Sequence, residues 1–165
     1  MNRPDLQRLP LLSVLDRLLD ADPDREREAP KSRRQALAEL REAVRRDLES
    51  LLNTRHRPLA WPATLDALGD SLLNFGIPDF ASANLATRSA QDEFRRSVEA
   101  AIRRFEPRFM QVSVQLIEPG DSLERSLRFR IEALMRLDPE PEPVVLDSLL
   151  DPATNSFAVR AGREG

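Results

Sequence analysis

The spacing of apolar residues changes along the chain from a helical repeat to the alternation of a β-strand. Over residues 32–53, aliphatic side chains recur at spacings of three and four, as they do in a helix with one buried face. Ser32 and Gln35 have the spacing of a capping box at the start of that helix. The pattern predicts a long amphipathic helix whose buried stripe contains Leu37, Leu40, Val44, Leu48 and Leu51.

Two further segments keep the helical repeat. A short one, over residues 64–74, stops before Gly76, a residue type that readily takes the left-handed conformation at a helix end. A longer one starts near Ser89 and must end before Pro107, because proline disfavours helical geometry in the residue before it. Its expected buried stripe consists of Phe94, Val98, Ala101, Ile102 and Phe105.

Beyond Pro107 the period of the apolar residues becomes two, which is typical of half-buried strands. The first predicted strand places Met110, Val112, Val114 and Leu116 towards the core. A turn at residues 119–121 leads to a second alternating stretch over residues 127–137, which completes an antiparallel hairpin. The proline-rich stretch 138–143 is expected to be an extended connector rather than a ladder strand.

Two more short strands are predicted, over residues 144–149 and 155–160. Helices followed by strands favour an α+β fold, with the N-terminal helices packed on one face of a small antiparallel C-terminal sheet. Residues 1–31 are read separately, as a short amphipathic N-terminal segment plus a flexible linker. Residues 32–165 are expected to form a single domain.

Composition narrows the chemistry. A net charge of −3 argues against a dedicated nucleic-acid binder, and the absence of cysteine removes disulfides and thiolate chemistry. His56 is the only imidazole, so no metal site and no cofactor site are expected. No apolar run approaches the roughly 20 residues that span a bilayer, and we expect a cytoplasmic protein without membrane insertion.

The tripeptide Glu106-Pro107-Arg108 stands where the helical pattern ends. Side chains two apart on an extended chain share a face, so the pattern predicts a carboxylate and a guanidinium held side by side. The pair is either an internal ion pair that pins helix to sheet or a charged docking point. Catalysis is not expected, because Arg108 would hold Glu106 ionised and glycoside hydrolysis generally uses two carboxylates.

The octapeptide from Ile102 to Phe109 resembles the signature of the baseplate wedge proteins of contractile phage tails and their type VI secretion counterparts, the TssE proteins. Other blocks resemble the same family in the same order along the chain. They are residues 13–18, 46–55, 71–80 and 127–147. The resemblance implies a structural baseplate component of a type VI secretion system, with a phage-tail or phage-derived injection-particle wedge protein and, less readily, a peptidoglycan hydrolase as alternatives.

The resemblance also implies partners and contact residues. Glu106, Pro107 and Arg108 would contact wedge proteins similar to TssF and TssG. The closing strands would initiate a contractile sheath of subunits similar to TssB and TssC, within a membrane-docked baseplate. Residues expected there are Val144, Val145, Leu146, Phe157 and Val159. The sheet edge is either open to strand addition or twisted to protect the monomer. Leu15 and Leu18 would dock on a neighbour or on the protein's own core.

Overall fold

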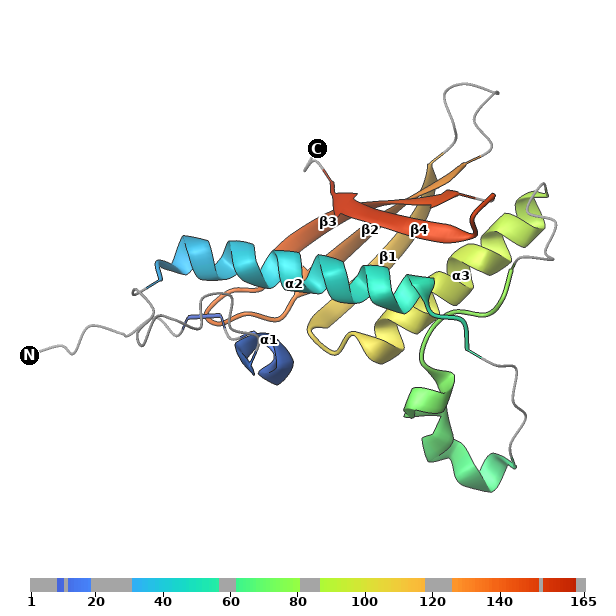
Figure 1. Cartoon of the computed structure of the whole chain (residues 1–165), viewed down its shortest axis with the longest axis horizontal. Coiled ribbons are helices and arrows are strands. Elements are labelled where there is room, and N and C mark those ends of the chain that lie inside the picture. The colour runs from blue at the N-terminus through green and yellow to red at the C-terminus, as the bar shows by residue number, and fades with distance from the viewer. Residues whose placement is uncertain are drawn as a thin grey trace, which may run out of the picture.

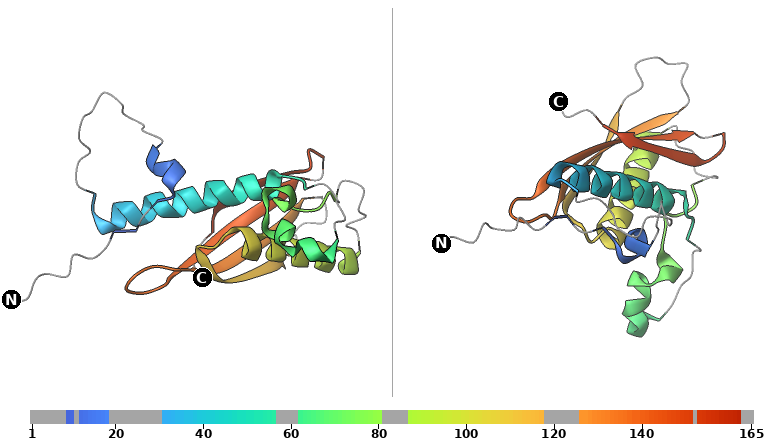
Figure 2. Two further views of the ribbon diagram at one scale, coloured as in Figure 1. Left: turned by 90° about the horizontal axis from the view of Figure 1, so that it is seen from below. Right: turned by 60° about the vertical axis from the view of Figure 1, so that its left-hand side comes forward.

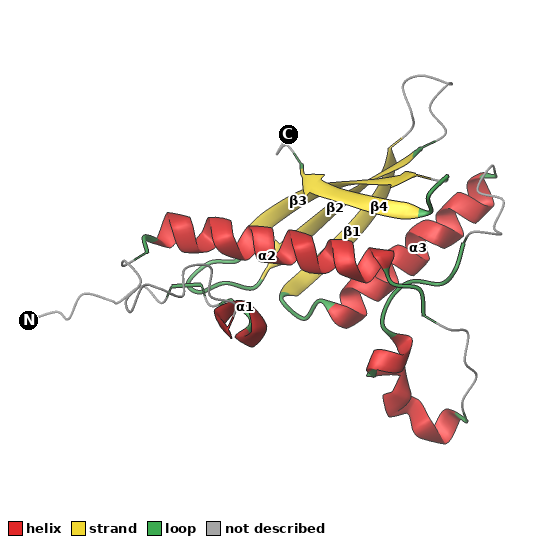
Figure 3. Ribbon diagram, in the orientation of Figure 1, coloured by secondary structure: helices red, strands yellow, loops and turns green. Residues whose placement is uncertain are grey.

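The computed structural model describes residues 9–10, 12–18, 31–56, 62–80, 87–117, 126–151 and 153–162. Its helices precede its strands, and helices α2 and α3 lie against one face of a single antiparallel sheet (Figures 1 and 3), which confirms the predicted α+β class. The elements are α1 (Val14–Leu18), α2 (Arg33–Asn53), η1 (Ala63–Asp70), η2 (Leu72–Asn74), α3 (Arg88–Phe105), β1 (Phe109–Ile117), β2 (Leu127–Met135), β3 (Glu142–Asp151) and β4 (Ser156–Ala161).

The strands follow one another in the sheet in the order β1-β2-β3-β4, so β1 and β4 are its two edges. The predicted linker apart from Lys31, the predicted turn at residues 119–121, and Trp61 lie outside the described residues. No helix in the described ranges has the length and apolar character that crossing a membrane requires.

Helix α2 begins as its sequence predicts. The Ser32 side chain accepts from the Gln35 main-chain N–H at 3.3 Å, and the Gln35 side chain accepts from the Ser32 N–H at 2.9 Å. This reciprocal capping box satisfies donors that have no partner within the helix. One face is buried, with Leu37 only partly covered. The buried residues are Ala36, Leu40, Ala43, Val44, Leu48, Leu51 and Leu52.

Helix α3 begins slightly earlier than predicted, because the side chain of Thr87 accepts from the Ala90 N–H and caps it. Phe94 on this helix is 1% exposed and forms the centre of the core. Its ring lies 5.4 Å from that of Phe129 on β2 and 6.0 Å from that of Phe157 on β4. Burial of one such side chain contributes about 1.5–3 kcal/mol, so this aromatic cluster holds α3 on the sheet.

The segment predicted as a short helix over residues 64–74 consists of two 3-10 pieces, η1 and η2, separated at Ser71. Gly76 follows with φ of +112°, as expected for the residue that ends it. A Cβ atom at this glycine would lie 2.4 Å from the Thr54 carbonyl oxygen. The close approach lets Ile77 donate to that carbonyl at 2.9 Å, which joins the end of α2 to residue 77.

Two details of the strands differ from the prediction. A β-bulge between Phe109 and Gln111 turns Met110 outwards, 51% exposed, while Phe109 takes the core position at 8%. The prediction that Met110 faces the core is therefore wrong. Pro143 belongs to β3 rather than to a connector, at the end of the strand that β4 does not reach. Its missing N–H donor is tolerated there because that end is an edge.

A charged corner and closing strands as the candidate binding site

The end of α3 fixes the corner geometry. Glu106 caps the helix with an N–H bond to the Ile102 carbonyl at 2.9 Å, and its φ of −116° takes it out of helical conformation. The Arg108 side chain returns to it: Nε donates to Glu106 Oε1 at 2.6 Å and Nη2 donates to Oε2. The Arg108 main-chain N–H adds a bond to Oε1 at 3.1 Å. The predicted side-by-side pair is present.

The two partners differ in burial. Glu106 is 4% exposed, whereas the Arg108 side chain is 24% exposed. Part of the Arg108 side chain therefore reaches the surface, but its Nη1 is buried without a hydrogen-bond partner among the described residues, and the Glu106 carboxylate lies behind it. Pro107 lies between them in the turn and is exposed. This arrangement pins the helix to the sheet and also leaves charge at the surface, so the two interpretations of the tripeptide are compatible.

Asp47 on α2 is the member of the site that sequence reasoning missed. Arg108 Nη2 donates to Asp47 Oδ2 at 2.7 Å, across 61 residues of sequence. Burial alone would lower the pKa of Arg108, but Glu106 and Asp47 outweigh burial and raise this pKa above its ordinary value. Asp47 lies at the margin of the buried stripe of α2, and no local pattern singles it out. The guanidinium joins one buried carboxylate to one that is 40% exposed.

Helix α1 is tied to the same group of charges. Arg46, next to Asp47 and 3.6 Å from its carboxylate, also pairs with Asp16 of α1. The Ser13 hydroxyl donates to Asp16 at 2.7 Å and, together with Arg46, lowers the pKa of that carboxyl against the opposing effect of burial. The charges of α1, α2 and the corner thus form one chain of contacts.

Helix α1 lies on the side of α2 that faces away from the sheet (Figure 2). It buries none of its own residues, and of the described residues before it Leu12 packs partly against the core. Leu15 is 65% exposed and Leu18 is 75% exposed. The structure places these leucines at the surface of α1, next to the chain of charges.

The residues singled out on the closing strands mostly belong to the core. Val144 and Leu146 of β3 are 5% and 4% exposed, and Phe157 and Val159 of β4 are 4% and 3% exposed. Val145 points to the other face and is half-buried, because Gly162 packs against it. A Cβ atom on Gly162 would lie 2.8 Å from Val145 Cγ1. Phe157 pairs with Leu150 and Val159 with Ser148, further along β3, whereas Val144, Val145 and Leu146 lie where β3 begins and β4 ends.

A groove of about 340 Å³ runs between those ends and the first turns of α2. Leu37 and Arg41 line it on the helix side, and Val145, Ala161 and Gly162 line it on the strand side. β3 continues here beyond the last residue of β4, since Ala161 pairs with Leu146. The groove is the place where the closing strands meet the surface.

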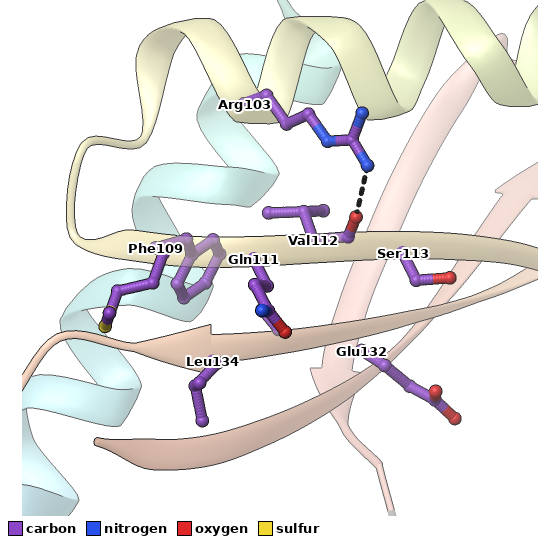
Figure 4. A pocket seen from close by; sticks show the side chains of 9 residues that line it. Arg103, Phe109, Gln111, Val112, Ser113, Glu132 and Leu134 are labelled. Atoms are coloured by element: carbon purple, nitrogen blue, oxygen red, sulfur yellow. Dashed lines mark hydrogen bonds between the residues drawn. The ribbon is translucent and has the colours of Figure 1, made fainter. Parts of the chain in front are cut away.

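A larger, open hollow of about 700 Å³ lies beside the bulge of β1 (Figure 4). Met110, Gln111 and Glu132 line it. Arg103 reaches over it from α3 and donates to the Val112 carbonyl at 2.9 Å (Figure 4).

Within the described residues, no group of three or more His, Cys, Asp and Glu side chains is placed to hold a metal ion. His56 donates its main-chain N–H to Ile77 at 3.2 Å.

The fold and the corner together define a small α+β domain with a charged helix-to-strand junction. Residues 38–140, more than half of the chain, match the family of baseplate wedge protein gp25, and the chain belongs to this family. The family is one of phage-tail-like baseplate components. The chain is also similar to the anti-adapter protein IraD of Salmonella arizonae (strain ATCC BAA-731 / CDC346-86 / RSK2980), with 32% identity over 109 residues, 64% of this chain and 75% of that protein.

Proposed function

We propose that this protein is a structural baseplate component of a type VI secretion system, which binds wedge and hub partners and initiates sheath assembly. The match of residues 38–140 to the baseplate wedge family carries this proposal. Its partners would resemble TssF and TssG at the wedge and TssB and TssC in the sheath. It would act in the bacterial cytoplasm, on a baseplate docked at the membrane.

The charged corner is the proposed wedge-binding surface. Arg108 is partly exposed and held in a fixed direction by Glu106 behind it, while Asp47 beside it is 40% exposed. A guanidinium fixed in this way loses little side-chain entropy when a partner binds. A donor of the partner would approach the exposed Asp47 carboxylate, beside the part of the Arg108 side chain that reaches the surface. Pro107, exposed between the paired residues, would contribute apolar contact.

The proposed sheath contact is the groove at the ends of β3 and β4. Val144, Val145 and Leu146 line it directly. Phe157 and Val159 lie within the adjoining core and hold β4 in place. Leu15 and Leu18, exposed on α1, are proposed to contact a neighbouring subunit of the baseplate.

We further propose that residues 32–165 form one domain to which residues 1–31 are appended. Helix α1 buries none of its own residues, so the core does not depend on that helix. Deletion of residues 1–31 should leave a protein that unfolds in a single cooperative transition. A truncated protein without native near-ultraviolet circular dichroism would contradict this division.

The proposed work is binding, not catalysis. Both Glu106 oxygens accept from the Arg108 guanidinium, so this carboxylate is engaged by the ion pair rather than directed at a substrate. A zymogram of the purified protein against peptidoglycan should show no clearing. Clearing that disappears in the Glu106→Gln variant would establish a hydrolase instead.

Affinity purification from the native host tests the proposed partners. The tagged wild-type protein should bring down baseplate wedge and sheath proteins. The double variant Glu106→Leu with Arg108→Met removes both charges and should lose the wedge proteins. The matched control is Lys31→Met with Glu39→Gln. It removes an exposed ion pair of 3.0 Å near the start of α2, and this variant should still bring down the wedge proteins. Retention by the folded corner variant would mean that the corner is only structural.

The similarity to an anti-adapter protein supports a second candidate function, in which the same fold binds a single adapter protein. The same purification separates the two candidates, because an adapter with no baseplate proteins would be recovered in that case. Recovery of phage structural proteins would favour the phage-derived alternative. The genes flanking this one would distinguish a secretion system from a phage particle.

A further inference from the structure

Both edges of the sheet are occupied by side chains from the helices. In an antiparallel sheet, every second residue of an edge strand turns its N–H and C=O groups away from the strand beside it. Such groups are open to pairing with another chain unless something covers them. On β4 the outward-facing residues include Phe157 and Val159, and on β1 they include Val112 and Val114.

At the β4 edge, Asn53 occupies the place of a neighbouring strand residue. Its Nδ2 donates to the Phe157 carbonyl at 3.0 Å, and its Oδ1 accepts from the Phe157 N–H at 2.8 Å. A residue of a neighbouring strand makes these same two hydrogen bonds in a hydrogen-bonded pair. Arg45 donates to the Val159 carbonyl at 3.0 Å, and Arg55 donates to the Asn155 carbonyl at 2.6 Å. We call Arg45, Asn53 and Arg55 the β4 edge seal.

The β1 edge shows the same arrangement with a different set of side chains. Glu99 accepts from the Val114 N–H at 3.1 Å, and Arg95 donates to the Val114 carbonyl at 3.2 Å. Arg103 donates to the Val112 carbonyl at 2.9 Å. Four helical residues rise about 6 Å and two strand residues about 6.7 Å, so side chains four apart on a helix can match alternate strand residues.

The repetition of this arrangement on two unrelated helices indicates that closing the edges is a property of the fold. We infer that the β4 edge seal holds this protein closed against a second copy of itself, and that β4 pairs with β4 of another copy when the seal is removed. The inference is independent of the proposed function.

The sequence of β4 fits such a pairing. Antiparallel pairing about Ala158 joins Phe157 of each copy to Val159 of the other, which are the residues that the seal occupies. It also sets Arg160 opposite Ser156 of the other copy. Arg160 is the only charged residue of β4, so no like charges face each other directly.

Asn53 is the member of the seal to test, because its amide alone supplies both a donor and an acceptor. Asn53→Leu removes both bonds to Phe157, and Asn53→Asp keeps only the acceptor. Asn74→Leu is the matched control, since the Asn74 amide donates to the Gly69 carbonyl at 3.0 Å, in the 3-10 segment.

The mass of the full chain in solution is measured by light scattering during size-exclusion chromatography. The measurement covers a hundredfold range of protein concentration. The wild type and Asn74→Leu should remain monomers. Asn53→Leu should form dimers, and Asn53→Asp should form them only at higher concentration. A folded Asn53→Leu variant that stays monomeric overturns the inference. If Asn53→Leu does not fold, Asn53→Asp decides in the same way.

A cross-link identifies the surface. The chain has no cysteine, so Ser156→Cys with Arg160→Cys introduces the only thiols. These positions face each other across the proposed pair of β4 strands. Oxidation should link two chains when Asn53→Leu is also present, and should not link them in the otherwise wild-type protein. A dimer of Asn53→Leu that these cysteines do not link uses another surface and overturns the inference.

Discussion

Replacing Arg108 by methionine should destabilise the protein although the side chain is partly exposed. The substitution removes the guanidinium from Glu106, which is 4% exposed and would keep only the main-chain N–H of residue 108 as a donor. A buried charge left without its partner costs about 3–5 kcal/mol. Because the Arg108 side chain is 24% exposed, water can reach the site, and we expect the lower end, about 3 kcal/mol.

The double variant separates the charge from the shape. Glu106→Leu with Arg108→Met removes both members of the pair, so no uncompensated carboxylate remains. Its free energy of unfolding should lie at least about 2 kcal/mol above that of Arg108→Met, since apolar replacement of a whole buried pair is often neutral. Both variants also lose the contact with Asp47. Because the Asp47 side chain is 40% exposed, this loss should lower the free energy of unfolding by no more than about 1 kcal/mol.

Urea unfolding followed by circular dichroism measures each variant, and the wild type, the two single variants Glu106→Leu and Arg108→Met and the double variant form a double-mutant cycle. For a chain of this size, a loss of about 3 kcal/mol lowers the melting temperature by about 6–12 °C. An Arg108→Met variant that loses less than about 1 kcal/mol would refute the reasoning. A double variant no more stable than Arg108→Met would refute it equally, because the penalty would then not come from the unpaired carboxylate.

Further predictions concern the backbone, the bulge and α1. Gly76→Ala should lose more than about 1 kcal/mol in urea unfolding, because alanine is strained at φ of +112° and its Cβ would meet the Thr54 carbonyl; unchanged stability would contradict the described turn. Met110→Lys should change stability by less than about 0.5 kcal/mol, whereas Val112→Lys should unfold the protein, since only Val112 is buried; equal effects would contradict the bulge. The Asp16 carboxyl should titrate below 3.8 by NMR. Its folded pKa is depressed, so its contribution to stability is present above the unfolded pKa and is lost as the pH falls through the folded value; a midpoint above 3.8 would contradict the contact.

The sequence predicts what local interactions determine. The capping box of Ser32 and Gln35 and the stripe of α2 depend on residues within a few positions of each other, and both were predicted. The pairing of Glu106 with Arg108 is also local, across two residues, and it was predicted from the proline between them. These features follow from backbone geometry that does not need the rest of the fold.

The position of the bulge could not be predicted in the same way. Phe109 and Met110 are both apolar, and the alternation fits Met110 as the inward residue. The structure buries Phe109 and lets Met110 and Gln111 share the outer side. The choice depends on which side chain fills the space beneath the corner. The alternation of polar and apolar residues holds no information about that space.

The remaining differences involve contacts between distant segments. Asp47 meets Arg108 across 61 residues, and Asn53 meets Phe157 across 104. In the sequence, Asn53 is only a polar residue at the end of a predicted helix. The outward-facing groups of β4 were expected either to be available for pairing or to be protected by twist. The structure closes them over residues 155–159 with the side chains of Arg45 and Asn53 of α2 and of Arg55 just beyond it, so of the two alternatives the open edge does not apply there.

The bonds between helix side chains and strand edges also constrain how the length of this protein can vary. One residue inserted within α3 between Arg95 and Glu99 would rotate everything beyond it by about 100°, and one insertion in α2 before Asn53 would do the same. Either insertion would separate bonding partners that lie on different elements, and it would also turn core residues beyond it, such as Leu52 of α2 or Ile102 of α3, away from the buried face. Changes in length should therefore be tolerated between the elements and rejected inside these two helices, whose phase relative to the sheet is fixed from both sides.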